Sequence, residues 1–168
     1  MGNITIRRAE ITDAEALADC MANIHAEDLD TIFKRNKPTL TDAQQLIQLV
    51  GLMANSFLLI AEEKGRIVAM LDFTAFKDIQ RSHSGMFGIS VVKEFRSKGI
   101  GQSLIEMLLK ELKNTNISRV ELQVFSNNPK AVKLYESLGF EHEGRKRRAV
   151  RIGDKYCDIL LMAKFLKA

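Results

Sequence analysis

The chain has 168 residues, 46% of them hydrophobic and 27% charged, so it is long enough to bury the core of one ordinary domain and too apolar to be intrinsically disordered. Its formal net charge of +4 suits a small anionic ligand and is too weak to require nucleic acid as a partner. Its two cysteines, Cys20 and Cys157, lack the spacing of a zinc site or a disulfide framework, and we expect both thiols to be reduced and buried.

The chain is expected to begin with a strand and a helix. Residues 4–7 alternate between apolar and polar side chains, as strands do. Residues 12–15 (TDAE) have the pattern of a capping box, which predicts that a helix begins there. The apolar residues at helical spacing are Leu17, Met21 and Ile24. Residues 29–40 are expected to be a connection.

A second helix and a hairpin are predicted next. Residues 41–44 (TDAQ) repeat the capping signal. The apolar stripe of this helix is Leu46, Leu49, Val50 and Met53. Residues 57–61 and 67–76 are apolar runs on either side of the turn-forming pair Lys64-Gly65, which predicts two antiparallel strands.

The second half of the chain is expected to alternate strands and helices. Residues 83–92 predict a strand, with Phe87, Ile89 and Val91 on one face and Met86, Gly88 and Ser90 on the other. An amphipathic helix with an apolar face follows the turn at 95–101; that face is Leu104, Ile105, Leu108 and Leu112. Residues 120–124 predict a strand, 128–139 a helix ended by Gly139, and 140–152 with 155–165 a hairpin that turns at 153–154.

This order of elements predicts one α/β domain over residues 1–168, with a mixed sheet and helices on both faces. The first residues lack the apolar core of a signal peptide, and no apolar run is long enough to span a membrane. We therefore expect a cytoplasmic protein without a membrane partner.

The turn Arg96-Ser97-Lys98-Gly99-Ile100-Gly101 has the composition of an anion-binding site. It precedes an amphipathic helix, whose N-terminus offers N–H groups and a partial positive charge, and its glycines let the backbone approach a ligand. A P-loop is absent, and a dinucleotide-binding fingerprint is excluded because Leu104 stands at the third glycine position. Taken alone, a Gly-x-Gly of this kind is equally compatible with an ordinary β–α turn.

The helix from Asn128 to Phe140 contains a second candidate motif. Taken alone, Asn128 is an ordinary helix cap, and Tyr135 is more typical of a packed side chain than of a catalytic one. Together with the upstream turn, however, the segment resembles the GNAT N-acetyltransferases. The turn matches their [Q/R]-x-x-G-x-[G/A] loop, and N-x-x-A-x-x-L-Y-E-x-x-G-F over residues 128–140 matches their second signature. The finer resemblance, over residues 81–89, 121–125 and 144–162, is to bacterial amino-acid N-acetyltransferases.

The resemblance covers essentially the whole chain and implies a GNAT fold, whose mixed sheet is mostly antiparallel and has six to seven strands. It also implies acetyl-CoA as co-substrate and no metal. Backbone groups of Ile89 and Val91 would bind the pantetheine arm, and the glycine turn would bind the pyrophosphate. The acetyl-CoA-binding residues that it implies are Ile89, Ser90, Val91, Arg96, Ser97, Lys98, Gly99, Ile100, Gly101, Gln102, Ser103, Asn128 and Tyr135.

The implied reaction is direct attack of an amine on the thioester. An N–H near Val91 would polarise the carbonyl group, and Tyr135 would protonate the departing thiolate as general acid. The candidates for a general base are Glu27, Asp72, Asp78, His83 and Glu121. The residues expected to contact the acceptor are His25, Glu27 and His83. For each of these, a solvated or structural charge is the competing interpretation.

The acceptor remains open at this point. An amino acid is the first hypothesis, and a polyamine, another small amine, a peptide or a protein is the alternative. Two other classes of function compete. The chain could be a non-catalytic acyl-CoA sensor, or the basic run at 145–148 with Arg151 could bind nucleic acid, although alternate residues of a strand face opposite ways. A homodimer is compatible with the resemblance.

Overall fold

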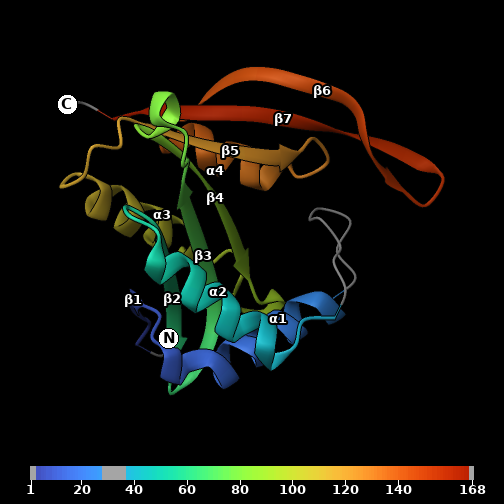
Figure 1. Cartoon of the computed structure of the whole chain (residues 1–168). Helices are drawn as coiled ribbons and strands as arrows, with labels where there is room; N and C mark the ends of the chain where they lie inside the picture. The colour runs from blue at the N-terminus through green and yellow to red at the C-terminus, as the bar shows by residue number, and fades with distance from the viewer. Residues whose placement is uncertain (1–2, 28–36, 167–168) are drawn as a thin grey trace.

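The structure is a computed structural model, and it describes residues 3–27 and 37–166. These residues form one seven-stranded sheet in the order β1-β2-β3-β4-β5-β7-β6 (Figure 1). The strands are β1 (Thr5–Arg8), β2 (Phe57–Glu63), β3 (Arg66–Ala75), β4 (Ser84–Val91), β5 (Arg119–Phe125), β6 (Glu141–Ile152) and β7 (Lys155–Phe165). The helices are α1 (Ala14–Ala26), α2 (Leu40–Leu52), α3 (Ile100–Leu112) and α4 (Pro129–Ser137). Short 3₁₀ helices are η1 (Ile11–Asp13), η2 (Ile79–Arg81) and η3 (Lys93–Phe95).

The sheet is mixed and mostly antiparallel, because every neighbouring pair is antiparallel except β4 with β5. This confirms the predicted element order and sheet type. Strand boundaries lie within one or two residues of the predicted ones. The predicted connection at 29–40 falls mostly outside the described residues.

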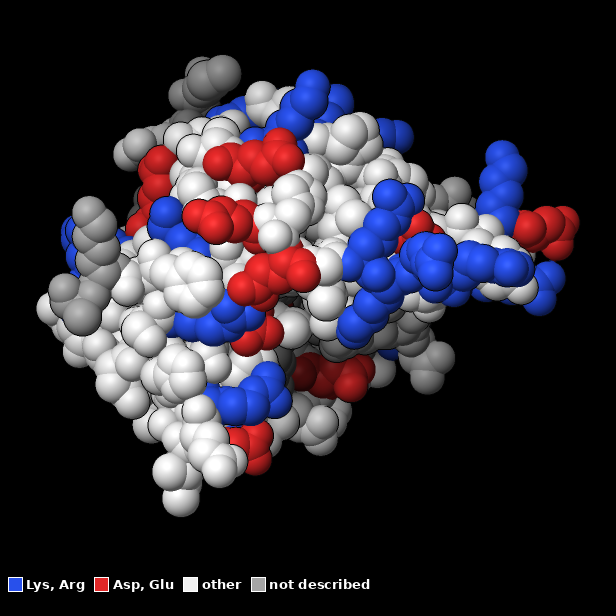
Figure 2. Space-filling model, turned by 90° about the horizontal axis from the view of Figure 1, so that it is seen from above, with Lys and Arg blue, Asp and Glu red and all other residues white. Residues whose placement is uncertain are grey.

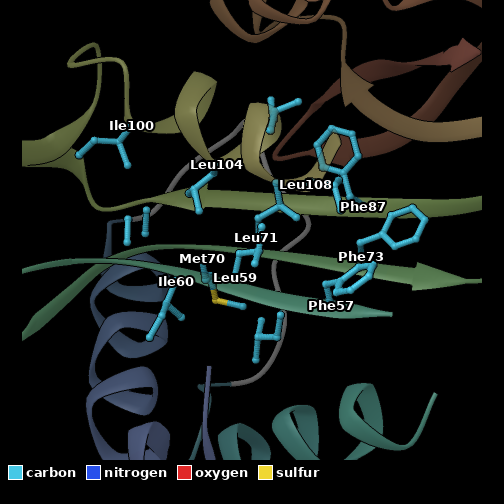
Figure 3. Close-up of a cluster of buried hydrophobic side chains, with 14 of the residues drawn as sticks. Phe57, Leu59, Ile60, Met70, Leu71, Phe73, Phe87, Ile100, Leu104 and Leu108 are labelled. Atoms are coloured by element: carbon cyan, nitrogen blue, oxygen red, sulfur yellow. The ribbon is translucent and has the colours of Figure 1, made fainter. Parts of the chain in front are cut away.

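Helices cover both faces of the sheet, as predicted. Helices α1 and α2 contact β2 and β3 from one side, whereas α3 contacts β1 to β4 from the other. Because side chains alternate between the two faces along each strand, the same strands pack against helices on both sides. Figure 3 shows Leu71 beside Leu104 and Leu108 on the α3 side, while Ile60 and Met70 point toward α1. Two apolar layers therefore hold the central strands in place.

The predicted starts of the first two helices were wrong by one and two residues, respectively. The 3₁₀ helix η1 precedes α1, and the Glu10 N–H donates to the Asp13 carboxylate at 2.7 Å, so Thr12 is not the cap. Arg7 donates to the same carboxylate at 2.7 Å, which holds Asp13 in this position. Helix α2 begins after Thr39, because Thr39 and Asp42 close a reciprocal capping box with hydrogen bonds of 2.7 and 3.2 Å.

The buried face of α2 also differs from the predicted apolar stripe. The buried residues are Ala43, Ile47 and Val50, whereas Leu49 is 60% exposed. Leu46 lies at the edge of the buried face. A stripe spaced i, i+4, i+7 from Ala43 fits one helix face, and Leu49 falls outside it.

The two cysteines are buried and carry free thiols, as predicted. Cys20 lies on α1 with Leu17 and Ile24, and burial raises the pKa of its thiol to about 12. Cys157 lies on β7 in a small cluster with Phe125 and Ile159.

Strands β3 and β4 approach each other closely at Gly85. A Cβ there would lie 2.4 Å from Phe73 Cζ and 2.6 Å from the Thr74 carbonyl oxygen. Gly85→Ala should therefore lower the free energy of unfolding by about 1–3 kcal/mol through overpacking, as measured by urea denaturation. The control is Gly51→Ala on α2, where a Cβ meets nothing within 4 Å. This control should leave stability unchanged or raise it by about 0.5–1 kcal/mol, and equal stabilities of the two variants would contradict the tight approach.

Candidate active site

The site is built on the one parallel pair of strands. Strands β4 and β5 pair at only three positions, Ser84–Met86 with Arg119–Glu121. Beyond them β4 continues along β3 to Val91, while β5 continues along β7 to Phe125, so the two strands separate toward their carboxyl ends (Figure 1). Open α/β sheets bind ligands where neighbouring strands separate at their carboxyl ends, and we call this separation of β4 from β5 the crevice.

The register shows which backbone groups of β4 point into the crevice. The Val92 N–H donates to the Val68 carbonyl at 2.9 Å, and the Phe76 N–H donates to the Ser84 carbonyl at 3.0 Å. Successive residues of an antiparallel strand direct their backbone groups alternately to the two sides. The even-numbered residues of β4 therefore bond to β3, whereas Phe87, Ile89 and Val91 direct their N–H and C=O groups away from it, toward the crevice.

The same reasoning identifies the backbone groups that β5 directs toward the crevice. The Ser126 N–H donates to the Asp158 carbonyl at 2.9 Å, and the Leu166 N–H donates to the Ser118 carbonyl at 2.8 Å. Even-numbered residues of β5 thus bond to β7, and Gln123 directs its backbone groups toward β4. Backbone donors and acceptors from two strands line the crevice. Gln123 was missed from the sequence because only the pairing register reveals it.

Three aromatic rings pack together on the α3 side of the sheet, beside the crevice. Phe87, Tyr135 and Phe140 meet edge to face, with ring centroids 5.8–6.0 Å apart. Tyr135 is 7% exposed, and this burial raises the pKa of its phenol to about 12. The structure shows no hydrogen-bond partner for its hydroxyl within residues 3–27 and 37–166. Tyr135 therefore presents a neutral donor at neutral pH.

The glycine turn leads from β4 into α3 through left-handed backbone. Ser97 has φ 59° and Gly99 has φ 81°. The Ser103 N–H donates to the Gly99 carbonyl at 3.0 Å and closes the first helical turn, so the N–H groups of residues 100–102 point out of the helix end. Gly101 lies close to α4 and β4, since a Cβ there would lie 3.6 Å from Leu134 and 3.7 Å from Ile89. This arrangement suits an anion.

Arg96, the first residue of the loop motif, points back toward the protein. Its Nε donates to the Val91 carbonyl at 2.9 Å, and its guanidinium group pairs with the Glu27 carboxylate. The same carboxylate accepts the Lys93 N–H at 2.7 Å. Glu27, one of the predicted acceptor contacts and bases, thus lies at the end of α1 against the glycine turn. The Lys98 ammonium lies 4.9 Å from the Phe95 ring centroid.

The other candidate bases fall into two groups. Asp78 and the exposed His83 lie before β4, at the closed end of the strand pair and away from the crevice. Asp72 lies on β3 beside β4, and Glu121 lies on β5 at its last paired position with β4. Asp72 is the register partner of Gly88, and Glu121 accepts a hydrogen bond from Arg119 Nε at 3.0 Å.

Asp72 and Glu121 share the sheet face that α1 and α2 cover, whereas Phe87 and Tyr135 lie on the α3 face. Among the predicted site residues, the structure thus brings Tyr135, the β4 backbone and the glycine turn together. His25 is exposed on the last turn of α1. The Asn128 side chain accepts the Ala131 N–H at 3.2 Å and caps α4.

The basic run lies on the hairpin of β6 and β7, which extends past the carboxyl end of β5 beside the crevice (Figure 1). Figure 2 shows Lys and Arg side chains gathered along this projecting hairpin. Arg145 donates to Asp158 at 2.6 Å, and Arg148 lies 4.1 Å from the Tyr156 ring centroid. Much of this charge is therefore engaged within the hairpin.

Two classes of site have no counterpart in the described part of the chain. Residues 3–27 and 37–166 contain no group of three or more His, Cys, Asp or Glu side chains that could hold a metal ion. None of the described helices is both long and apolar enough to cross a membrane.

Comparison with known proteins gives one consistent result. Residues 6–161 match the model of the acetyltransferase (GNAT) domain. The chain is similar to the L-amino acid N-acetyltransferase AaaT of Escherichia coli, with 31% identity over 98% of this chain and 99% of the relative. It is also similar to the [ribosomal protein bS18]-alanine N-acetyltransferase of E. coli, with 30% identity over 53% of this chain and 60% of the relative.

The fold comparison agrees. The crystal structure of an acetyltransferase of the GNAT family from Streptococcus pneumoniae superposes with a TM-score of 0.91. It is 26% identical, over 98% of this chain and all of that one.

Proposed function

The chain belongs to the GNAT acetyltransferase family and uses acetyl-CoA as acetyl donor, and we propose that its acceptor is the amine of an amino acid. The observation that carries the proposal is the likeness to the amino-acid acetyltransferase AaaT, which extends over nearly the full length of both chains. Substrates vary on this kind of fold, so the acceptor has to be tested directly.

Acetyl-CoA fits the crevice on several independent grounds. Its pyrophosphate needs N–H donors without an intervening side chain, and the turn at residues 97–102 with its helix N-terminus offers them. Its pantetheine arm carries amides, which match the outward-facing backbone groups of Ile89, whereas at Val91 only the N–H is open because the carbonyl accepts from Arg96. When bound, acetyl-CoA supplies an acetyl thioester that an amine attacks directly. The Arg96 guanidinium group is engaged with Glu27, so in this proposal it supports the glycine turn and does not contact acetyl-CoA.

The chain's own groups complete the reaction. The Val91 N–H, directed into the crevice, stabilises the developing oxyanion. Tyr135 donates its proton to the sulfur that departs as the new C–N bond forms and the C–S bond breaks. Asp72 or Glu121 accepts the proton of the attacking amine from the opposite face of the sheet, directly or through a water molecule. The acid and the base thus approach the reacting carbon from opposite sides.

A peptide N-terminus is the second candidate acceptor, because the bS18-alanine acetyltransferase matches about half of this chain. A polyamine is less favoured on physical grounds. Residues 145–155, which extend beside the crevice, carry six lysines and arginines against one aspartate, so they repel a polycation.

The acceptor is tested by measuring CoA release across amino acids, polyamines and short peptides. We expect turnover with amino acids and little with polyamines. Turnover with peptides alone would show that the acceptor is a peptide N-terminus and not an amino acid. If acetyl-CoA raises the melting temperature but no amine is acetylated, the result would contradict the catalytic proposal and indicate an acyl-CoA sensor.

Tyr135→Phe tests the general acid. Removal of the hydroxyl should lower kcat by about 10²–10⁴-fold and leave the Kd of acetyl-CoA nearly unchanged. Because burial raises the pKa of Tyr135 to about 12, the wild-type enzyme should not lose activity through ionisation of this phenol as the pH rises from 7 to about 10. A fully active Tyr135→Phe enzyme would remove Tyr135 from this role.

Gly99→Ala tests the pyrophosphate site. A Cβ at Gly99 meets no protein atom within 4 Å, so in the free protein it costs only the strain of φ 81°, about 1–2 kcal/mol. Gly65→Ala is the matched control, since Gly65 has the same φ and equally open space in the β2–β3 turn. Both variants should lose similar stability, and only Gly99→Ala should weaken acetyl-CoA binding in calorimetry. Equal affinities would place the phosphates elsewhere.

A further inference from the structure

Glu27 joins three segments that are distant in sequence. It follows α1, and its carboxylate accepts the Lys93 N–H of η3 at 2.7 Å and pairs with Arg96, 69 positions further along the chain. Arg96 in turn donates from Nε to the Val91 carbonyl at the end of β4, at 2.9 Å. The Glu27 side chain is 12% exposed and that of Arg96 is 33% exposed, so this cluster is largely shielded from water.

The cluster restrains the end of β4. Arg96 occupies the Val91 carbonyl, while the next N–H, that of Val92, donates to the Val68 carbonyl at 2.9 Å. The peptide group between these two residues is therefore held from both ends. With that peptide group fixed, the neighbouring Val91 N–H has little freedom to rotate away from the crevice.

The cluster also restrains the strained turn that follows. Ser97 has a positive φ of 59° without being glycine. Backbone in this region persists only where the surrounding structure determines it. The contacts that fix the preceding residues come from the side chains of Glu27 and Arg96, together with the Arg96 N–H, which donates to the Lys93 carbonyl at 3.2 Å.

We propose that Glu27 is a positioning residue that acts through Arg96 and Lys93 to hold the glycine turn and the Val91 N–H in the geometry that binds acetyl-CoA. The inference rests on the proposed placement of acetyl-CoA in this crevice. Glu27 binds no part of acetyl-CoA itself. Its carboxylate sets the shape of a site formed by the backbone, and a preformed site binds more tightly than one that must be ordered on binding.

The experiment compares Glu27→Ala and Glu27→Gln by the Kd of acetyl-CoA in calorimetry. Loss of hydrogen bonds to a charged group predicts a Kd for Glu27→Ala that is about 10- to 100-fold higher. Glu27→Gln keeps a side-chain oxygen that accepts from Lys93 or Arg96, so it should recover most of the affinity. In turnover with an amine acceptor, KM for acetyl-CoA should rise far more than kcat falls.

The Arg7–Asp13 pair provides a matched control for a merely structural role. It is also a partly buried arginine–carboxylate pair, with side-chain exposures of 38% and 13%, and lies at the β1 end of the sheet, away from the crevice. Asp13→Ala should lower the melting temperature at least as much as Glu27→Ala and leave the Kd of acetyl-CoA within about twofold, because remote sites act independently. An equal rise in Kd for both variants, or none for Glu27→Ala, would overturn the proposal.

A double-mutant cycle with Arg96→Ala tests the route of action. If Glu27 acts through Arg96, the Kd of the double variant should be at most about threefold higher than that of the single variant with the higher Kd. Fully multiplicative losses would contradict the coupling. Because Kd is measured without an acceptor, failure of the amino-acid assignment leaves this test valid, whereas a wild-type protein that does not bind acetyl-CoA would overturn both.

Discussion

The limited pairing between β4 and β5 is the constraint on which the site depends. The two strands share three paired positions, whereas β4 pairs with β3 over seven positions and β5 with β7 over seven. Each strand is therefore held by its outer neighbour and does not need the other for order. The separation leaves the backbone groups of Ile89 and Gln123, and the N–H of Val91, facing a gap. A ligand that carries amides can satisfy groups that a continuous sheet would have used internally.

The aromatic cluster and the acidic residues lie on opposite faces of the sheet at this gap. Phe87, Tyr135 and Phe140 pack on the α3 face, and burial raises the pKa of the Tyr135 phenol to about 12. Asp72 and Glu121 lie on the face that α1 and α2 cover. Strand alternation alone produces this division, because residues of opposite parity on one strand must point to opposite faces. The phenol and the two carboxylates are thereby held on opposite sides of the sheet.

The sequence predicts the elements well and the contacts between distant segments poorly. Gly139, Asn128 and the turn at 153–154 carry local signals, and each element boundary there lies within two residues of its prediction. The start of α2 was misplaced because Thr39 and Thr41 are both competent caps, and only the hydrogen bonds to Asp42 distinguish them. The contact of Glu27 with Arg96 has no local pattern at all. Which residues of β4 face the crevice likewise depends on the register, which periodicity does not specify.

The buried thiols have a practical consequence for work with this protein. The chain contains two cysteines, both buried, and the raised pKa of Cys20 leaves almost no thiolate there at neutral pH. Because the thiolate is the reactive species, Cys20 reacts slowly with disulfide reagents and peroxide, and the burial of Cys157 limits access to its sulfur. The folded protein therefore contributes little background in colorimetric detection of CoA thiol. A rise in that background over time would report unfolding of the preparation.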